Sequence, residues 1–266
     1  DETVGAEAKK LYDEANEMLS AYIADKKITA NGVIAFYPAN SAGDDILLYS
    51  EDGNRCTETH IGTLHTLRQQ AEKESDDPFF AMSDFIAPLD SGIKDYVGMF
   101  AVTAGIGTEE LIASYKEALD DYRVIMCEAL ADRLAEAFAE AIHLEIRKDY
   151  WGYAPEESLA NEDLLKIKYD GIRPAPGYPS QPDHTEKRIM WDLMKADEVG
   201  ISLTESFAMW PAASVSGLIF AHKDSKYFAV GKITEEQVKD YASRKREPVE
   251  VVEKWLRPIL AYDTDV

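Results

Sequence analysis

Apolar residues recur at steps of three and four positions in several long stretches, which is the period of a helix that buries one face. The pattern predicts helices over residues 4–25, 64–73, 108–150, 183–199, 234–244 and 248–260. The longest of these, residues 108–150, has a continuous apolar stripe that we expect to be buried: Leu111, Tyr115, Leu119, Tyr122, Ile125, Met126, Leu130, Leu134, Phe138, Ala141 and Ile142.

Other stretches are short, apolar and rich in β-branched or aromatic residues, and they predict strands. Residues 33–37 and 46–49 form a predicted hairpin joined through the polar segment 40–45, and residues 96–102 a buried strand. Two strands joined near Pro211 are predicted within 203–221, and another over 226–232. Long helices and short strands that do not alternate regularly predict one α+β domain over 1–266, with a twisted antiparallel sheet flanked by the helices.

The composition is that of a soluble globular protein, with 266 residues of which 45% are hydrophobic and 29% charged. No apolar run approaches the roughly 20 residues of a membrane helix, and no secretory signal opens the chain, so we expect a cytoplasmic protein. Cys56 and Cys127 are far apart and predict two reduced thiols. The net charge of −22 argues against a nucleic-acid surface. It favours solubility, and it could attract a cationic ligand such as a sulfonium.

A glycine turn follows the predicted strand 96–102. Gly105-Ile-Gly107 leads into a helix that we expect Thr108 to cap. Strand, Gly-x-Gly and helix is the outline of a nucleotide loop, but Glu110 stands at the third glycine position, where its charge would oppose a phosphate. A tight turn is therefore favoured, and a free-standing methyltransferase with its cofactor at this turn is an alternative.

Three potential metal ligands share one face of the predicted helix 108–150. Glu136, Glu140 and His143 lie four and three positions apart. Glu140-x-x-His143 has the spacing of a di-iron carboxylate motif, which needs a second copy on another helix, and the sequence contains none. A charged helix face is therefore favoured over a metal site.

Residues 169–187, which we call the strap, hold four of the eleven prolines between Pro174 and Pro182. Proline fixes φ and removes a backbone donor, so the strap is predicted to be a stiff, irregular loop. Arg173, Gly177 and Tyr178 give it one guanidinium, one permissive glycine and one aromatic ring, which favours a ligand clamp. At its end, Asp183 and Glu186 are predicted to form a capping box. His184 could be a ligand, but a structural role is favoured for a histidine at the start of a helix.

The strap sequence Gly171-Ile-Arg-Pro-Ala-Pro-Gly-Tyr-Pro179 resembles the S-adenosylmethionine-binding activation (reactivation) domain of cobalamin-dependent methionine synthase. The similarity extends over nearly the whole chain, in order. Further runs that carry it are Ala131–Glu140, Trp151–Pro155, Leu203–Gly217, Asp224–Val230 and Leu260–Asp263.

The resemblance implies a function and a set of site residues. In that family the domain binds S-adenosylmethionine and donates its methyl group to cobalamin on a neighbouring domain, which reactivates the enzyme for methionine biosynthesis. A flavodoxin or flavoprotein reductase supplies the electron. By this resemblance Arg173 would hold the ligand's carboxylate, and Glu136 would approach its ammonium or sulfonium end. The residues that would complete the site are Ala175, Gly177, Tyr178, Tyr227 and Phe228.

Two departures from the family pattern affect these expectations. Family domains begin with a further segment whose aspartate contacts the ligand, and residues 1–266 start after it, so we expect weakened binding. Phe228 stands where many members have a tyrosine, which would remove one hydroxyl. The competing interpretation is a non-catalytic docking module for the cobalamin and reductase domains, without a ligand of its own.

Overall fold

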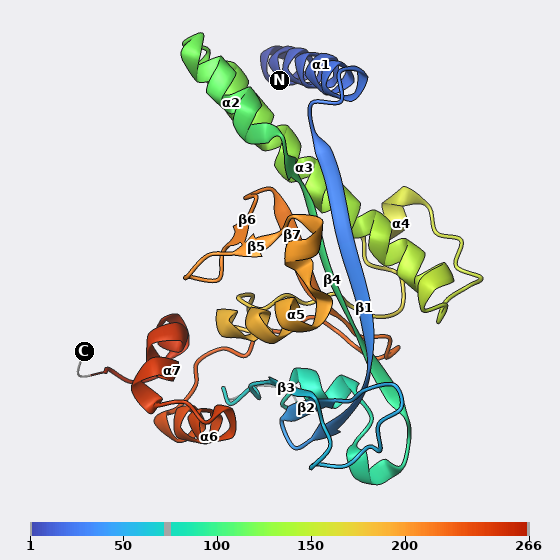
Figure 1. Ribbon diagram of the computed structural model, residues 1–266, viewed down its shortest axis with the longest axis vertical. Helices are drawn as coiled ribbons and strands as arrows, with labels where there is room; N and C mark the ends of the chain where they lie inside the picture. The colour runs from blue at the N-terminus through green and yellow to red at the C-terminus, as the bar shows by residue number, and fades with distance from the viewer. Residues whose placement is uncertain (1, 72–75, 265–266) are drawn as a thin grey trace. The chain divides into compact units, whose positions relative to one another are not determined.

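The computed structural model describes residues 2–71 and 76–264, and its chain divides into two compact units, each built from several segments (Figure 1). Unit 1 comprises residues 1–33, 101–144 and 196–216, and unit 2 comprises 34–100, 145–195 and 217–266. A five-stranded sheet has the order β3-β2-β1-β4-β7, and a separate pair joins β5 to β6. The predicted α+β class with an antiparallel sheet is confirmed.

The strands are β1 (Thr29–Ala42), β2 (Asp45–Leu48), β3 (Gly62–His65), β4 (Asp95–Ile106), β5 (Ser202–Leu203), β6 (Met209–Trp210) and β7 (Ser214–Ile219). The α-helices are α1 (Glu2–Ala24), α2 (Thr108–Glu117), α3 (Asp121–Glu145), α4 (Asn161–Leu165), α5 (Lys187–Met194), α6 (Glu235–Lys245) and α7 (Val249–Leu256).

Unit 1 contains α1, α2, most of α3 and the β5–β6 pair. Its small core packs alanines of α3 against Ala104 of β4 and against Ala213, which directly precedes β7. The predicted helix over 108–150 is interrupted: α2 ends before Leu119, which has φ of +54° and is 89% exposed, and a π-helical turn over Ile146–Tyr150 follows α3. The predicted stripe was therefore partly wrong. Tyr122 and Ile125 are also exposed, and the buried residues of α3 are mostly small: Val124, Met126, Cys127, Ala131, Ala135, Ala139 and His143.

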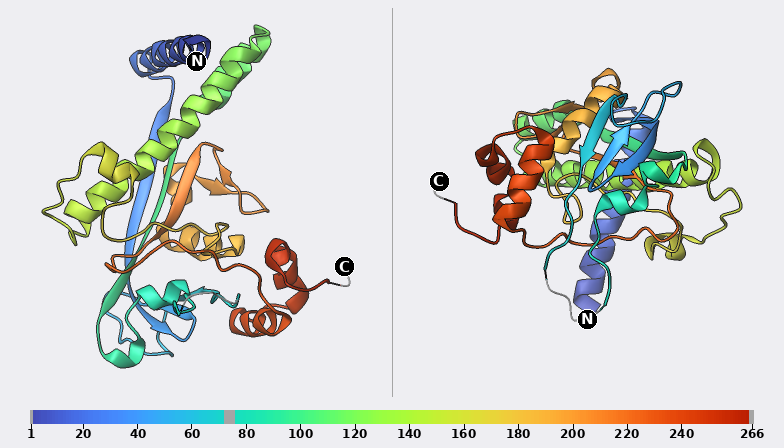
Figure 2. Two further views of the ribbon diagram at one scale, coloured as in Figure 1. Left: turned by 180° about the vertical axis from the view of Figure 1, so that it is seen from behind. Right: turned by 90° about the horizontal axis from the view of Figure 1, so that it is seen from below.

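Unit 2 contains the β2–β3 pair, the strap and the two C-terminal helices. The predicted hairpin is confirmed, with Ala42 opposite Asp45, although β1 continues to Ala42 and Asn40 is buried. The helix predicted over 64–73 is wrong over its described part, 64–71, and the rest lies outside the described residues. Leu64 of β3 pairs with Ile46 of β2, so tertiary pairing overrides a short local preference. Helices α6 and α7 lie side by side in both figures and share a core with Leu67 and Val230 (Figure 2).

Helix boundaries follow local chemistry. Thr234 caps α6 as predicted and accepts a hydrogen bond from the Gln237 backbone N–H. Thr108 does not cap α2: Gly107 is the N-cap, with φ of +92°, and the Thr108 hydroxyl donates to the Gly105 carbonyl. The predicted helix 183–199 is divided, because Lys195 adopts a left-handed conformation after α5.

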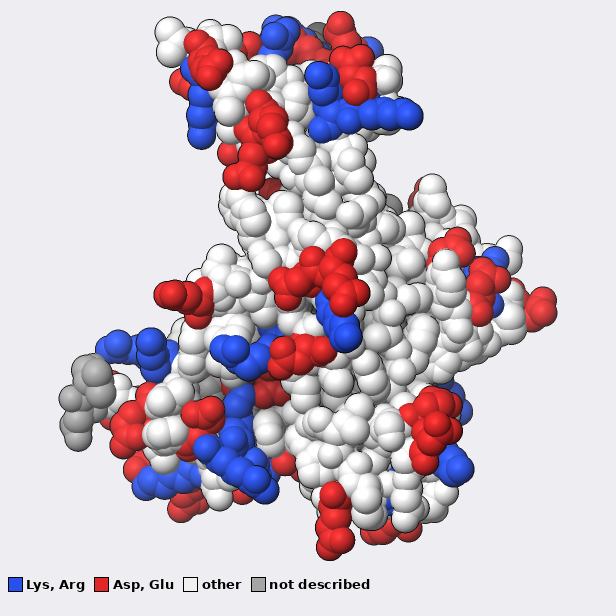
Figure 3. All heavy atoms as spheres, viewed as in Figure 1, with Lys and Arg blue, Asp and Glu red and all other residues white. Residues whose placement is uncertain are grey.

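No helix in the described part of the chain is long and apolar enough to cross a membrane. On the face shown in Figure 3, acidic side chains are scattered widely. Basic side chains gather among them at the lower left, over the C-terminal helices. The face shown is thus one of mixed charge.

Candidate functional site

The first part of the strap is joined to the end of β7 by backbone hydrogen bonds. Ile172 and Phe220 exchange two N–H to carbonyl bonds of 3.0 Å, and the Leu218 N–H donates to the Pro174 carbonyl at 2.8 Å. Gly171 has φ of +86°, and a Cβ there would lie 2.6 Å from the Phe220 carbonyl oxygen. The strap is therefore held in place without being a strand, as its proline content predicted.

A tight turn over residues 175–181 follows. The Tyr178 N–H donates to the Ala175 carbonyl at 3.1 Å, and the Gln181 N–H donates to Tyr178 at 2.9 Å. The Gly177 N–H donates to the Gln181 carbonyl at 2.7 Å. Gly177 has φ of +97°, a conformation that favours glycine. This turn leaves the Tyr178 side chain 66% exposed.

Arg173 lies between two tyrosines. Its Nη1 donates to the Tyr169 hydroxyl at 2.7 Å, and its backbone N–H donates to the Tyr227 hydroxyl at 3.0 Å. Tyr227 is 44% exposed. The fold thus brings together Arg173 and Tyr227, two predicted site residues that are 54 positions apart in the sequence.

Tyr169 in turn rests on a buried ion pair. The Arg147 guanidinium carbon lies 3.9 Å from the centre of the Tyr169 ring, and Arg147 pairs with Glu157 at 2.7 Å. Both charged side chains are almost fully buried. A buried bidentate pair of this kind is geometrically specific, so it gives Tyr169, and through it Arg173, a rigid support.

The segment that contains Tyr227 and Phe228 is not the predicted strand 226–232. Its backbone pairs elsewhere: the Val230 N–H donates to the Pro179 carbonyl at 2.8 Å, and the Ala229 carbonyl accepts from the Gln69 side chain. Its neighbour in the strap is rich in proline, which lacks the N–H groups that a ladder requires. Phe228 packs in an aromatic group with Phe80 and Phe85, whereas Tyr227 points to Arg173.

Glu136 is exposed on α3 in unit 1, whereas the other six predicted site residues belong to unit 2. Its proposed approach to the ligand stays a prediction. Its helix neighbour His143 is fully buried. Within residues 2–71 and 76–264 no group of three or more His, Cys, Asp or Glu side chains could hold a metal ion.

The glycine turn after β4 has a packing explanation. A Cβ at Gly105 would lie 2.5 Å from Pro211, and one at Gly107 would lie 2.3 Å from the Lys27 carbonyl oxygen. Both glycines are therefore required by close contacts inside unit 1. This favours the interpretation as a tight turn.

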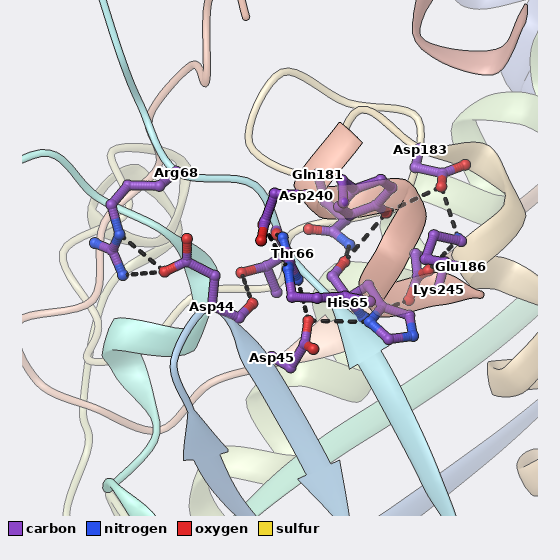
Figure 4. A network of polar contacts seen from close by, with 12 residues as sticks. Asp44, Asp45, His65, Thr66, Arg68, Gln181, Asp183, Glu186, Asp240 and Lys245 are labelled. Atoms are coloured by element: carbon purple, nitrogen blue, oxygen red, sulfur yellow. Dashed lines mark hydrogen bonds and ion pairs between the residues drawn. The ribbon is translucent and has the colours of Figure 1, made fainter. Parts of the chain in front are cut away.

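The end of the strap is tied to α6 by a buried polar network (Figure 4). Lys245 Nζ contacts Asp183 at 2.8 Å and Glu186 at 2.5 Å, and the Tyr241 hydroxyl donates to Asp183 at 2.9 Å. The predicted capping box is half correct. Asp183 accepts from the Thr185 N–H, but Glu186 accepts from the His65 backbone N–H instead of reaching back.

The pKa values in this network follow from burial and pairing. Burial opposes the charge of Asp183, but Lys245 and the Thr185 hydrogen bonds outweigh it and lower the pKa of this carboxyl. For Glu186, burial dominates and raises the pKa despite Lys245. Burial opposes the charge of Lys245 too, but the two carboxyls raise its pKa. The three groups therefore depend on one another for their charge.

His184 is predicted to make stability depend on pH. Burial, and then the charge of Lys187, lower the pKa of this imidazole below its ordinary value of 6.5. Between the two values the unfolded chain binds more protons than the folded one, so stability rises with pH up to about 6.5. We expect the free energy of unfolding from urea melts to fall as pH drops from 7 toward 5. His184→Phe should reduce this slope, and an unchanged slope would contradict the assignment to His184.

Sequence reasoning missed two supports of the site. Tyr169 precedes Arg173 by four positions, but a tyrosine before a proline-rich loop has no distinctive pattern. Lys245 is 62 positions from Asp183. In the sequence it stands out only as a basic residue at the end of a predicted helix, and such a residue is usually exposed to solvent, where it interacts with the helix dipole.

Comparison with known proteins identifies the family of the chain. Residues 1–246 match the family described as vitamin B12 dependent methionine synthase, activation domain. A solved structure titled "Crystal Structure of the MetH Reactivation Domain bound to AdoHcy" is 51% identical, with a TM-score of 0.95. The match covers 99% of this chain and 80% of that one. The chain therefore belongs to the family of activation domains of vitamin B12 dependent methionine synthase, a methyltransferase whose cobalamin is carried by another domain.

Proposed function

We propose that this chain binds S-adenosylmethionine at the strap and presents its methyl group to the cobalamin of a neighbouring methionine synthase domain for reactivation. The observation that carries the proposal is the placement of Arg173 against Tyr227, beside an exposed Tyr178 on the same strap. The family match and the AdoHcy complex of a 51% identical protein support it.

The side chains at the strap suit such a ligand. A guanidinium pairs with a carboxylate through two hydrogen bonds, so Arg173 would hold the amino-acid end. The exposed rings of Tyr178 and Tyr227 offer faces for an adenine or a sulfonium. Ala175 and Gly177 would contribute backbone groups of the turn, Phe228 an apolar wall, and Glu136 a carboxylate for the ammonium or sulfonium end.

The residues of this chain would bind and orient the ligand and need not move a proton. Bound cobalamin supplies the nucleophile, and the sulfonium is already a good leaving group, so positioning is the protein's contribution. We therefore propose that the chain alone binds ligand without turnover. In the full enzyme, we propose that a flavodoxin or flavoprotein reductase delivers the electron.

Titration of the chain with S-adenosylhomocysteine in a calorimeter tests the proposed site. Arg173→Ala should weaken binding by about 1.5–3 kcal/mol, the scale of a hydrogen bond to a charged group. Arg123→Ala, at an exposed arginine of α3 that pairs with nearby Asp120, is the control and should bind as the wild type does. Undiminished affinity in Arg173→Ala would reject the site assignment.

The docking-module alternative predicts a different pattern. It requires no heat of binding with the nucleoside and a salt-sensitive association with the cobalamin or reductase domains. The alternative at Gly105–Gly107 predicts that Gly107→Val abolishes binding while Arg173→Ala does not. Because a side chain at Gly107 would strike the Lys27 carbonyl, the Gly107→Val result counts only if that variant retains the wild-type melting temperature.

A further inference from the structure

The turn 175–181 has hydrogen bonds that close it and hold its C-terminal end, but the packing behind Gly177 comes from a side chain outside it. Three short-range bonds close the turn, the Pro179 carbonyl accepts from Val230, and the Gln181 side chain donates to the His65 carbonyl. Pro179 and Tyr178 are both exposed. A short loop of this kind exchanges conformations unless a side chain fills the space behind it.

The imidazole of His184 occupies that space. A Cβ on Gly177 would lie 2.2, 2.5 and 2.7 Å from the ring atoms Cε1, Nδ1 and Nε2 of His184. The His184 ring therefore occupies the space that a side chain at position 177 would need. Glycine is needed at 177 for its positive φ and also because His184 is there.

His184 is itself held firmly. It opens the short helical turn His184–Glu186, whose N-cap is Asp183, and Asp183 is bonded to Tyr241 and Lys245 of α6. Its Nδ1 lies 3.4 Å from Nζ of Lys187, and burial lowers the pKa of that lysine. A cationic imidazole would face the Lys187 ammonium, so the packed ring is the neutral one.

We propose that His184 is a positioning residue of the ligand site, whose ring, packed on Gly177, holds the turn 175–181 so that Ala175, Gly177 and Tyr178 meet the ligand together. The inference rests on the proposed function for its ligand, but the support of the turn stands on the geometry alone. Loss of the ring frees the turn, and binding must then restrict it again.

Three variants test this proposal. His184→Ala removes the ring, His184→Phe keeps a flat ring without nitrogens, and His60→Ala alters an exposed histidine elsewhere in unit 2. In calorimetry with S-adenosylhomocysteine, His184→Ala should bind about tenfold more weakly. His184→Phe should stay within about threefold of the wild type at pH 7.5, and His60→Ala should match it.

Amide hydrogen exchange of the free chain gives a readout that needs no ligand. His184→Ala should speed exchange at the Gly177, Tyr178 and Gln181 amides, the three donors of the turn, and leave those of α6 unchanged. His184→Phe should keep the wild-type rates.

Two results would overturn the proposal: wild-type exchange and affinity in His184→Ala, or equal losses in the alanine and phenylalanine variants. If the wild type itself fails to bind the nucleoside, the proposed function fails, and the exchange rates still decide whether His184 holds the turn. If His184→Ala does not fold, His184→Ser, which also leaves the space behind the turn empty, takes its place and should show the same losses.

Discussion

Replacing Lys245 by methionine is expected to destabilise the protein by about 3–5 kcal/mol, the range for removing one partner of a buried ion pair. Lys245 is 12% exposed, and its two partners, Asp183 and Glu186, are 4% and 3% exposed. Methionine fills the space of the stem but leaves two buried carboxyls without their cation. Chemical denaturation at pH 7 measures the difference.

The matched control is Lys239→Met on the same helix. Lys239 pairs with Glu235 in an exposed i,i+4 pair, whose removal should cost no more than about 0.5 kcal/mol. Adding Asp183→Asn and Glu186→Gln to Lys245→Met should recover much of the loss, because no uncompensated charge then remains. A loss in Lys245→Met as small as in the control would show that the network contributes little.

The same variant has a predictable pH dependence. The pKa of Asp183 is lowered in the folded chain, so its contribution to stability is present above the unfolded value of about 3.9 and is lost as pH falls through the folded value. The difference between wild type and Lys245→Met should therefore shrink in acid. A difference that grows below pH 4 would contradict the ion-pair explanation.

Gly177→Ala is expected to abolish detectable binding of S-adenosylhomocysteine, because it disturbs the turn in two ways. An alanine with φ near +97° carries a strain of about 1–2 kcal/mol. Its Cβ would also strike the imidazole of His184, so either the ring or the turn must move. Calorimetry measures the binding, and a thermal melt shows whether the variant is folded.

Gly92→Ala separates the two effects. Gly92 also has positive φ, +71°, but a Cβ there meets nothing within 4 Å, so this variant carries the backbone strain alone. It should lose stability and keep its ligand affinity. In the double variant Gly177→Ala with His184→Ala, the free energy of unfolding should fall by less than the sum of the two single losses, because the two changes affect the same contact. If Gly177→Ala bound the ligand as tightly as the wild type does, the turn would not be part of the ligand site.

Much of the candidate site could be proposed from the sequence because its residues are close together in the chain. Arg173, Ala175, Gly177 and Tyr178 lie within six positions, and the proline density around them predicts a stiff loop by local sterics alone. The fold class followed similarly from the length and period of the apolar stretches. The resemblance to the activation domain, carried by several ordered motifs, needed no structure either, and the family match confirms it.

Tertiary structure decided the features that depend on distant partners. Local apolar content predicted a strand over 226–232 and a helix over 64–73. The chain instead bonds Val230 to a proline carbonyl of the strap and pairs Leu64 with Ile46. Likewise, Tyr122 and Ile125 of the predicted stripe are exposed whereas Met126 is buried, because the surfaces that cover a helix come from other segments.

The sequence by itself determined a stiff strap with one guanidinium, an α+β class and the family, because these depend on local sterics, periodicity and ordered motifs. Only the tertiary structure decided that Tyr169 and Tyr227 hold Arg173, that His184 lies behind Gly177, and that Lys245 ties the strap to α6. Hydrogen bonds and buried ion pairs form between the groups that the fold brings within about 3 Å of each other. The number of residues between two groups in the sequence does not predict that distance.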